Sequence, residues 1–177
     1  MICSVDELRN FIKSEETDAM LDSRLKAIES QIRSYTGNNF QIRSIRTSGT
    51  CISGVNAVEC STSIPVKSGD TIQISGSKLN SGLYVISEVK ENVLTVKEDL
   101  LDEVDVCITK VSYPADVKMG AVNMLKWDLK NRDKAGIQSE TLSRHTVTYA
   151  DMSGENSKLG YPKSLVGFLK PYMRARF

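Results

Sequence analysis

The chain has 177 residues, 40% of them hydrophobic, and this length is enough to bury a core. It carries 23 Lys and Arg against 22 Asp and Glu, a net charge of +1, so it lacks the overall positive excess typical of proteins that bind nucleic acid or anionic membranes. No run approaches the roughly 18 apolar residues of a membrane-spanning helix, and the first residues do not follow the order of a signal peptide. We therefore expect a protein that stays in the cytoplasm of the cell that makes it.

Two amphipathic helices are predicted at the start of the chain. Ser4 is a suitable N-cap for a short helix over residues 5–12. A second helix is predicted over residues 18–35, because apolar residues recur there at intervals of three and four, and Gly37 supplies a left-handed stop. The apolar stripe of this second helix consists of Leu21, Leu25, Ile28, Ile32 and Tyr35.

From residue 40 the apolar residues recur with a period of two. Alternating segments at 66–74, 83–89, 93–96 and 104–109 are separated by turns rich in Gly, Asn and Ser. Short strands of this kind, connected by tight turns, are typical of a small antiparallel barrel or sandwich. We expect residues 41–111 to form such a β module.

Helical periodicity returns after this β segment. Pro114 suits the first turn of a helix predicted over residues 114–134, and Pro162 likewise begins a helix predicted over residues 162–172. The fold class that follows is α+β. We expect a helical bundle of about four helices, made discontinuously from residues 1–40 and 112–177, with the β module of residues 41–111 inserted between them.

The cysteines and carboxylates do not indicate a metal site. Cys3, Cys51, Cys60 and Cys107 are widely spaced, with no Cys-x-x-Cys pair, so we interpret them as free thiols in apolar surroundings. The acidic cluster in the region 99–105 could bind a divalent cation weakly, but its spacing is not that of an EF-hand loop. We expect neither a metal nor a cofactor. The members of the acidic cluster are Asp99, Asp102, Glu103 and Asp105.

No catalytic motif is evident. The sequence contains no Gly-x-Ser-x-Gly, no phosphate-binding glycine-rich loop and no His-Glu-x-x-His. His145 is the only histidine, and we interpret it as a surface or hydrogen-bonded strand residue. We expect that the protein is not an enzyme and that no residue is catalytic.

The order of the segments resembles that of the tailed-phage head–tail connector, or adaptor, family. The resemblance covers the N-terminal helical pair, the helix begun by Pro114, a turn over residues 136–140, a Thr-rich strand ending at Tyr149 and a Gly-Tyr-Pro sequence at residues 160–162. It implies a homo-oligomeric, twelve-fold ring that binds the portal protein and a tail or stopper protein, and that prolongs the DNA exit channel. It also implies location in the virion, assembly in the bacterial cytoplasm and non-specific contact with the passing DNA. Residues 41–111 are longer than the link expected in the smallest members.

Two groups of residues are the site hypotheses. The C-terminus is rich in the aromatic, Met and Arg side chains that interface centres favour, and connector termini commonly reach neighbouring subunits or the portal. Basic residues also gather late in the helix predicted over residues 114–134, where they either favour the helix dipole or face DNA in a channel. The interface hypothesis comprises Phe168, Tyr172, Met173, Arg174, Arg176 and Phe177; the channel hypothesis comprises Lys126, Lys130, Arg132 and Lys134.

Two alternative functions remain at this point. A small β barrel can bind single-stranded nucleic acid through aromatic platforms in a basic groove, but Tyr84 is the only aromatic residue in 41–111. The chain could also be a monomeric regulatory adaptor. Self-association separates that reading from the connector, because a ring subunit needs two different and complementary surfaces.

Overall fold

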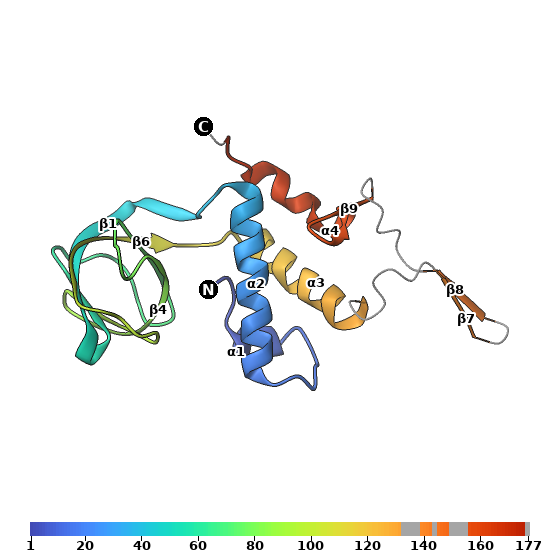
Figure 1. Cartoon of the computed structure of the whole chain (residues 1–177), viewed down its shortest axis with the longest axis horizontal. Coiled ribbons are helices and arrows are strands. Elements are labelled where there is room, and N and C mark those ends of the chain that lie inside the picture. The colour runs from blue at the N-terminus through green and yellow to red at the C-terminus, as the bar shows by residue number, and fades with distance from the viewer. Residues whose placement is uncertain (132–138, 143–144, 149–155, 176–177) are drawn as a thin grey trace. The chain divides into compact units, whose positions relative to one another are not determined.

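The computed structural model describes residues 1–131, 139–142, 145–148 and 156–175. The chain divides into two compact units. The barrel unit comprises Met1 and residues 39–113, and the helical unit comprises residues 2–38 and 114–177. Figure 1 shows the elements of both units along the chain.

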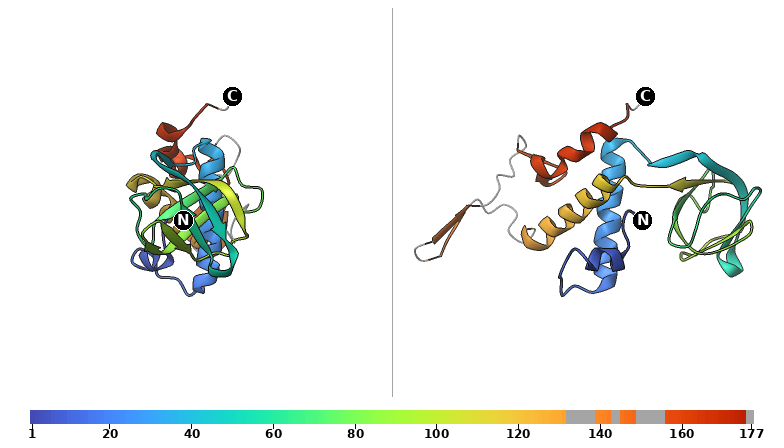
Figure 2. Two further views of the ribbon diagram at one scale, coloured as in Figure 1. Left: turned by 90° about the vertical axis from the view of Figure 1, so that its left-hand side faces the viewer. Right: turned by 180° about the vertical axis from the view of Figure 1, so that it is seen from behind.

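The barrel unit is a closed, six-stranded antiparallel β barrel with the strand order β1-β2-β5-β4-β3-β6. The pairing of β1 with β6 closes the sheet on itself, and the strands can be followed in the two further views of Figure 2. Closure leaves no exposed sheet edge. The elements are β1 (Gln41–Ile52), the 3-10 turn η1 (Ser53–Val55), β2 (Ala57–Cys60), β3 (Thr71–Ser75), β4 (Gly82–Lys90), β5 (Val93–Val96) and β6 (Glu103–Val111).

The barrel interior is filled by side chains from alternate strand positions. Ile72, Ile86 and Ile108 are fully buried there, as the period of two along each strand requires. Gly49 lets β1 approach β2 closely, because a Cβ at this position would lie 2.5 Å from the carbonyl oxygen of Glu59. The alternating segments seen in the sequence therefore do become strands around one apolar core.

The helical unit contains two long helices, α2 (Asp18–Thr36) and α3 (Ala115–Asn131). The predicted second helix is confirmed: Thr17 caps its first turn, and Gly37 ends it in the left-handed conformation with φ of 61°. Among the residues that the structure describes, no helix is both long and apolar enough to cross a membrane. The remaining elements are α1 (Val5–Arg9), β7 (Ser139–Leu142), β8 (His145–Thr148), β9 (Ser157–Lys158), β10 (Tyr161–Pro162), α4 (Lys163–Val166) and the 3-10 helix η3 (Gly167–Tyr172).

Specific side chains hold the C-terminal elements against α3. Tyr161 is buried, its hydroxyl donates to a carboxylate oxygen of Asp128 over 2.7 Å, and its ring meets that of Trp127 edge-on with centroids 5.4 Å apart. The ring of Phe168 occupies the space that a side chain at Gly120 would need. The Gly-Tyr-Pro sequence thus begins a docked segment, fixed by a buried polar bond and aromatic packing.

The predicted fold class, a mainly helical bundle with an inserted lobe, is wrong. Helix accounts for 36% and strand for 31% of the chain, and the principal body is the closed barrel. The first helix stops at Arg9, so it has only five residues, and the last predicted helix breaks into a four-residue α4 and the 3-10 helix η3. Pro171 lies inside η3, where its missing N–H prevents a regular α-helical ladder. Within the described ranges only α2 and α3 are long helices, which is too few for the predicted four-helix bundle.

Candidate functional site

One end of the barrel is formed by three connections that follow strands of the same direction. These are η1 after β1, residues 76–81 after β3 and residues 97–102 after β5. We call these three connections, together with residues 103–105 at the start of β6, the loop end. The chain enters β1 and leaves β6 at the opposite end of the barrel. The loop end is therefore the part of the barrel that carries no connection to the helical unit.

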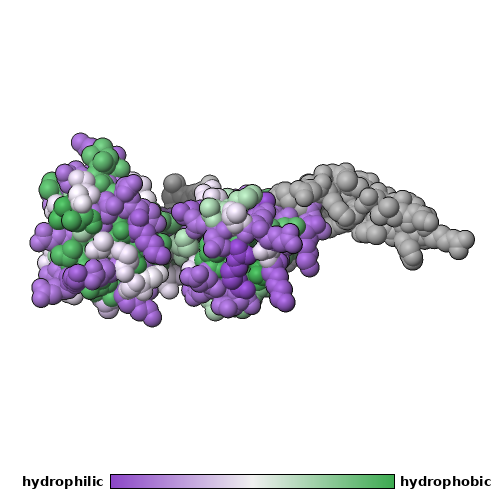
Figure 3. All heavy atoms as spheres, turned by 90° about the horizontal axis from the view of Figure 1, so that it is seen from below, coloured by the Kyte–Doolittle hydropathy of each residue, from purple (hydrophilic) through white to green (hydrophobic). Residues whose placement is uncertain are grey.

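Large apolar side chains are exposed at the loop end. Val55, Leu79, Leu101 and Val104 have relative exposures of 63%, 60%, 55% and 68%, the four highest values among the large hydrophobic residues of the described ranges. Figure 3 views the molecule from below and shows apolar residues lying among polar ones over the barrel unit. A group of exposed apolar side chains within one set of loops is typical of a protein contact surface.

A β-bulge lies beside the most exposed of these residues. Between the pairs Gly49↔Val106 and Cys51↔Glu103, β6 has one more residue than β1. Asp105 takes up this extra length with a positive φ of 58°, a conformation that aspartate adopts more readily than most residues. Bulges of this kind change the direction of neighbouring side chains, and here the neighbour is Val104.

The carboxylate of Glu103 fixes the β3–β4 loop. It accepts hydrogen bonds from the Ser77 hydroxyl and from the backbone N–H groups of Lys78 and Leu79, the latter two over 2.6 and 3.2 Å. The Asn80 side-chain amide is a further donor, at 3.0 Å. These donors, the Ser77 hydroxyl first, lower the pKa of Glu103 from 4.5 to about 2. The loop is thus held by a carboxylate that stays ionised at neutral pH.

Two asparagines tie the β5–β6 connection to the other loops. Asn80 accepts from the N–H of Leu101 over 2.8 Å and donates to its carbonyl over 2.9 Å. Asn56 accepts from the N–H of Leu100 and donates to Asp99, at 3.1 and 3.0 Å. Side chains that replace backbone partners in this way fix irregular loops. The exposed apolar residues therefore stand on loops of defined conformation.

The loop end is negatively charged. Residues 97–105 contain five carboxylates and one lysine, and the remaining loop-end residues add only Lys78. Some of these carboxylates already accept backbone or amide N–H groups; Asp102, for example, accepts from the N–H of Ser53 over 2.8 Å. In the described part of the chain no group of three or more potential ligands is placed to hold a metal ion. The arrangement combines apolar side chains with a negative field.

The C-terminal residues predicted as an interface have different positions. Phe168 packs on Gly120, and the Tyr172 hydroxyl donates to both carboxylate oxygens of Asp116 at 2.8 Å. Met173 is 50% exposed and Arg174 is exposed. Arg176 and Phe177 lie outside the described residues.

The predicted channel residues are described only in part. Lys126 is half-buried and Lys130 is exposed, one helical turn apart on α3, while Arg132 and Lys134 lie outside the described residues. His145 is the first residue of β8, and its side chain is outside the described part of the molecule. The structure gives no test of a DNA contact at these positions.

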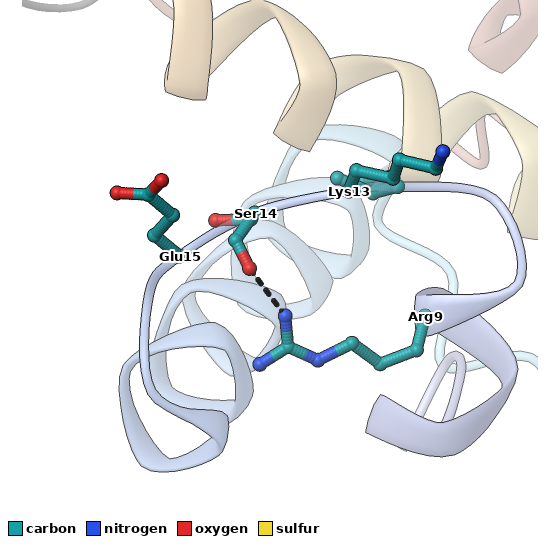
Figure 4. Close-up of a pocket in the computed structure, with 5 residues that line it drawn as sticks. Arg9, Lys13, Ser14 and Glu15 are labelled. Atoms are coloured by element: carbon teal, nitrogen blue, oxygen red, sulfur yellow. Dashed lines mark hydrogen bonds between the residues drawn. The ribbon is translucent and has the colours of Figure 1, made fainter.

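A hollow beside α1 is lined by Arg9, whose side chain links α1 to the loop that follows it. Its volume is about 490 Å³, and Figure 4 shows Arg9 reaching across it toward Ser14. The guanidinium donates to the carbonyls of Ser14 and Glu16 over 2.6 and 2.8 Å and pairs with Asp18 over 2.7 Å. Because its donors are used within the chain, Arg9 stabilises the α1–α2 loop and does not present a free charge for an anion.

The buried cysteines are not nucleophiles. Cys3, Cys51 and Cys60 are buried, and burial is the largest cause that raises the pKa of each thiol to about 11. Such thiols are protonated at neutral pH and behave as small apolar residues. Cys107 is a free thiol of intermediate exposure.

No protein-family model matches the chain, and no curated protein matches it in sequence. The loop end is thus identified from its geometry. Sequence reasoning noticed its acidic residues but missed the exposed Val55, Leu79, Leu101 and Val104. The available signal was the sequence of residues 97–105, in which carboxylates alternate with Leu and Val inside a segment of turns.

Proposed function

We propose that the protein is a structural assembly protein of the head–tail connector type, which forms a ring between a portal protein and a tail or stopper protein. The observation that carries the proposal is the loop end, where Val55, Leu79, Leu101 and Val104 are exposed on loops fixed by hydrogen bonds. An ordered apolar surface of this kind suits contact with another protein, because little conformational freedom is lost on binding.

The connector class is supported by the sequence resemblance. Its segments include the helix begun by Pro114 and the Gly-Tyr-Pro sequence at residues 160–162. Tyr161 of that sequence docks the C-terminal elements on α3, which brings residues 163–175 into the helical unit. A defined C-terminal segment is consistent with the partner contacts that the resemblance implies.

The charge of the barrel favours a protein partner over nucleic acid. The loop end carries five carboxylates against two lysines, and this excess of negative charge repels the phosphates of nucleic acid. Tyr84, the only aromatic residue of the barrel strands, is 9% exposed and therefore offers no stacking platform. In a connector the DNA would be a passing cargo, and Lys126 and Lys130 of α3 are the described candidates to face it.

The mechanism of such a protein is mechanical. No bond is made or broken, and the subunit holds two neighbours in a closed ring through surfaces that complement each other. Each contact need only be weak, because repeated contacts around a ring act together.

The test is the mass of the purified full chain, measured by light scattering alone and with purified portal protein. We expect self-association or co-migration with the portal in a fixed ratio of copies. A protein that is monomeric alone and does not bind the portal would contradict the proposal.

A further inference from the structure

We propose that the loop end of one copy binds the C-terminal segment, residues 170–175, of a second copy. This inference rests on the proposed function, since it names the surfaces through which copies of the chain would join. It commits to a head-to-tail contact, in which two different surfaces of the same chain meet.

The charges of the two surfaces are complementary. Residues 97–105 carry five carboxylates and one lysine. Residues 156–175 carry no Asp or Glu and four basic residues, which are Lys158, Lys163, Lys170 and Arg174. Complementary charge of this kind speeds encounter and excludes wrong partners. By the same argument, two loop ends would repel each other, which disfavours a symmetric contact through that surface.

The C-terminal segment is held by its backbone while key side chains remain exposed. The N–H of Arg174 donates to the carbonyl of Thr36 over 2.7 Å, and the Asn38 side chain donates to the carbonyl of Tyr172 over 3.3 Å. Met173 is half exposed. The segment thus presents an apolar and a basic side chain without relying on either to pack the described helical unit.

The loop end offers what such a segment needs. Leu101 and Val104 are exposed beside Asp102 and Asp105, so apolar and acidic groups alternate along one short stretch of chain. Methionine is an adaptable apolar side chain, and arginine forms forked hydrogen bonds to carboxylates. A Met-Arg pair against this stretch combines both kinds of contact.

The test uses two variants of the full chain that each lose one surface. Met173→Asp places a negative charge opposite the acidic loop end, and the double variant Leu101→Ser, Val104→Ser removes apolar contact from that end. We expect each variant alone to self-associate at least about tenfold more weakly than the wild type in sedimentation equilibrium. An equimolar mixture should form a one-to-one pair, because each variant retains the surface that the other has lost.

Two matched controls alter equally exposed residues elsewhere. Met20→Asp changes a methionine that is also 50% exposed, and Phe11→Ser changes a phenylalanine that is 49% exposed. Both should associate like the wild type. Raising the salt concentration should weaken association of the wild type, because exposed charge pairs are screened.

Three outcomes would overturn the inference. Association of both variants at wild-type strength would show that copies join through other surfaces, while the proposed function would stand. A variant mixture that stays monomeric, while the wild type associates, would mean that the two surfaces do not meet. A wild type that stays monomeric up to about 1 mM would contradict the inference directly. If that monomer still bound the portal, the proposed function would stand; if it also failed to bind the portal, the proposed function would be contradicted as well.

Discussion

The barrel unit and the helical unit are stabilised in different ways. Nearly all of the barrel comes from one continuous stretch, residues 39–113, whose strands are joined backbone to backbone until β6 meets β1. The helical unit joins two distant stretches, residues 2–38 and 114–177, through side chains: the Asn38 amide donates to the carbonyl of Tyr172, and the Lys158 ammonium lies over the ring of Tyr35. Side chains at the loop end can therefore vary without loss of the barrel ladder, whereas the helical unit depends on a few particular groups.

The largest effect should come from a charge in the core of the helical unit. Ile28 is 2% exposed on the apolar stripe of α2. Ile28→Asp should cost about 3 kcal/mol or more of unfolding free energy, because an unpaired carboxylate would be buried. Trp127, the only tryptophan, lies in the same unit and reports its unfolding by fluorescence. The control is Met20→Asp at a half-exposed position of the same helix, and melting of Ile28→Asp at the wild-type temperature would contradict the packing of α2.

A smaller effect is expected from the polar anchors of the C-terminal elements. Tyr161→Phe removes a 2.7 Å hydrogen bond to Asp128 in a buried setting and should cost about 1–3 kcal/mol. Tyr172→Phe removes the bonds to Asp116 at an exposed position, where water can replace the lost partner, and should cost less than Tyr161→Phe. Urea denaturation followed by Trp127 fluorescence compares the two. Equal losses would show that burial does not set the strength of these anchors.

The stability of the barrel unit should fall in acid, because the loop end relies on the ionised carboxylate of Glu103. The folded pKa of Glu103, about 2, lies below its ordinary value of 4.5, so the stabilisation is fully present above pH 4.5 and is lost as the pH falls toward 2. Glu103→Gln should lower the melting temperature at neutral pH and flatten its fall below pH 4.5. Thermal melts of both proteins between neutral pH and pH 2, by circular dichroism, measure this. Glu59→Gln, on an exposed position of β2, is the control, and parallel pH profiles for wild type and Glu103→Gln would rule out the proposed role of this carboxylate.

Local patterns were sufficient to predict the long helices and four of the six barrel strands. The stripe from Leu21 to Ile32 and the stop at Gly37 identify α2, since both signals lie within the helix itself. The strands β3 to β6 follow from their period of two. β1 and β2 were missed, because their apolar residues do not alternate with polar ones. Ile42 and Ile45 of β1 are three residues apart, and Ala57 and Val58 of β2 are adjacent. The share of helix in the fold was overestimated, because the apolar spacing in residues 162–172 predicts one regular helix and the structure has the short α4 followed by the 3-10 helix η3.

The loop end could not be predicted because its geometry depends on contacts between distant residues. Asn56 and Asn80 are recognisable as turn residues, but their partners Leu100 and Leu101 lie more than one strand away. Exposure of Val55 and Leu79 likewise depends on how three separate connections meet. The acidic cluster was visible in the sequence, yet its role in binding loop N–H groups follows only from the closed barrel.

The smallest effect is expected at the β6 bulge, which joins the stability of the barrel to the display of the loop end. Asp105 has a φ of 58°, so Asp105→Gly, which adopts this conformation freely, should change the unfolding free energy by less than about 1 kcal/mol. Asp105→Val is the matched comparison: a β-branched residue is strained at positive φ and should cost about 1–2 kcal/mol. Chemical denaturation of the two variants gives these values.

The same pair of variants tests whether the bulge serves the contact. If the bulge exists to present Val104, Asp105→Gly should keep most of the self-association, with a modest loss from the missing carboxylate, while Asp105→Val should lose both stability and association. Sedimentation equilibrium at a temperature where both variants are folded separates the two effects. Strong association of folded Asp105→Val would show that the contact between copies does not depend on the bulge. The exposure of Val104 at the loop end would then not be a consequence of the bulge.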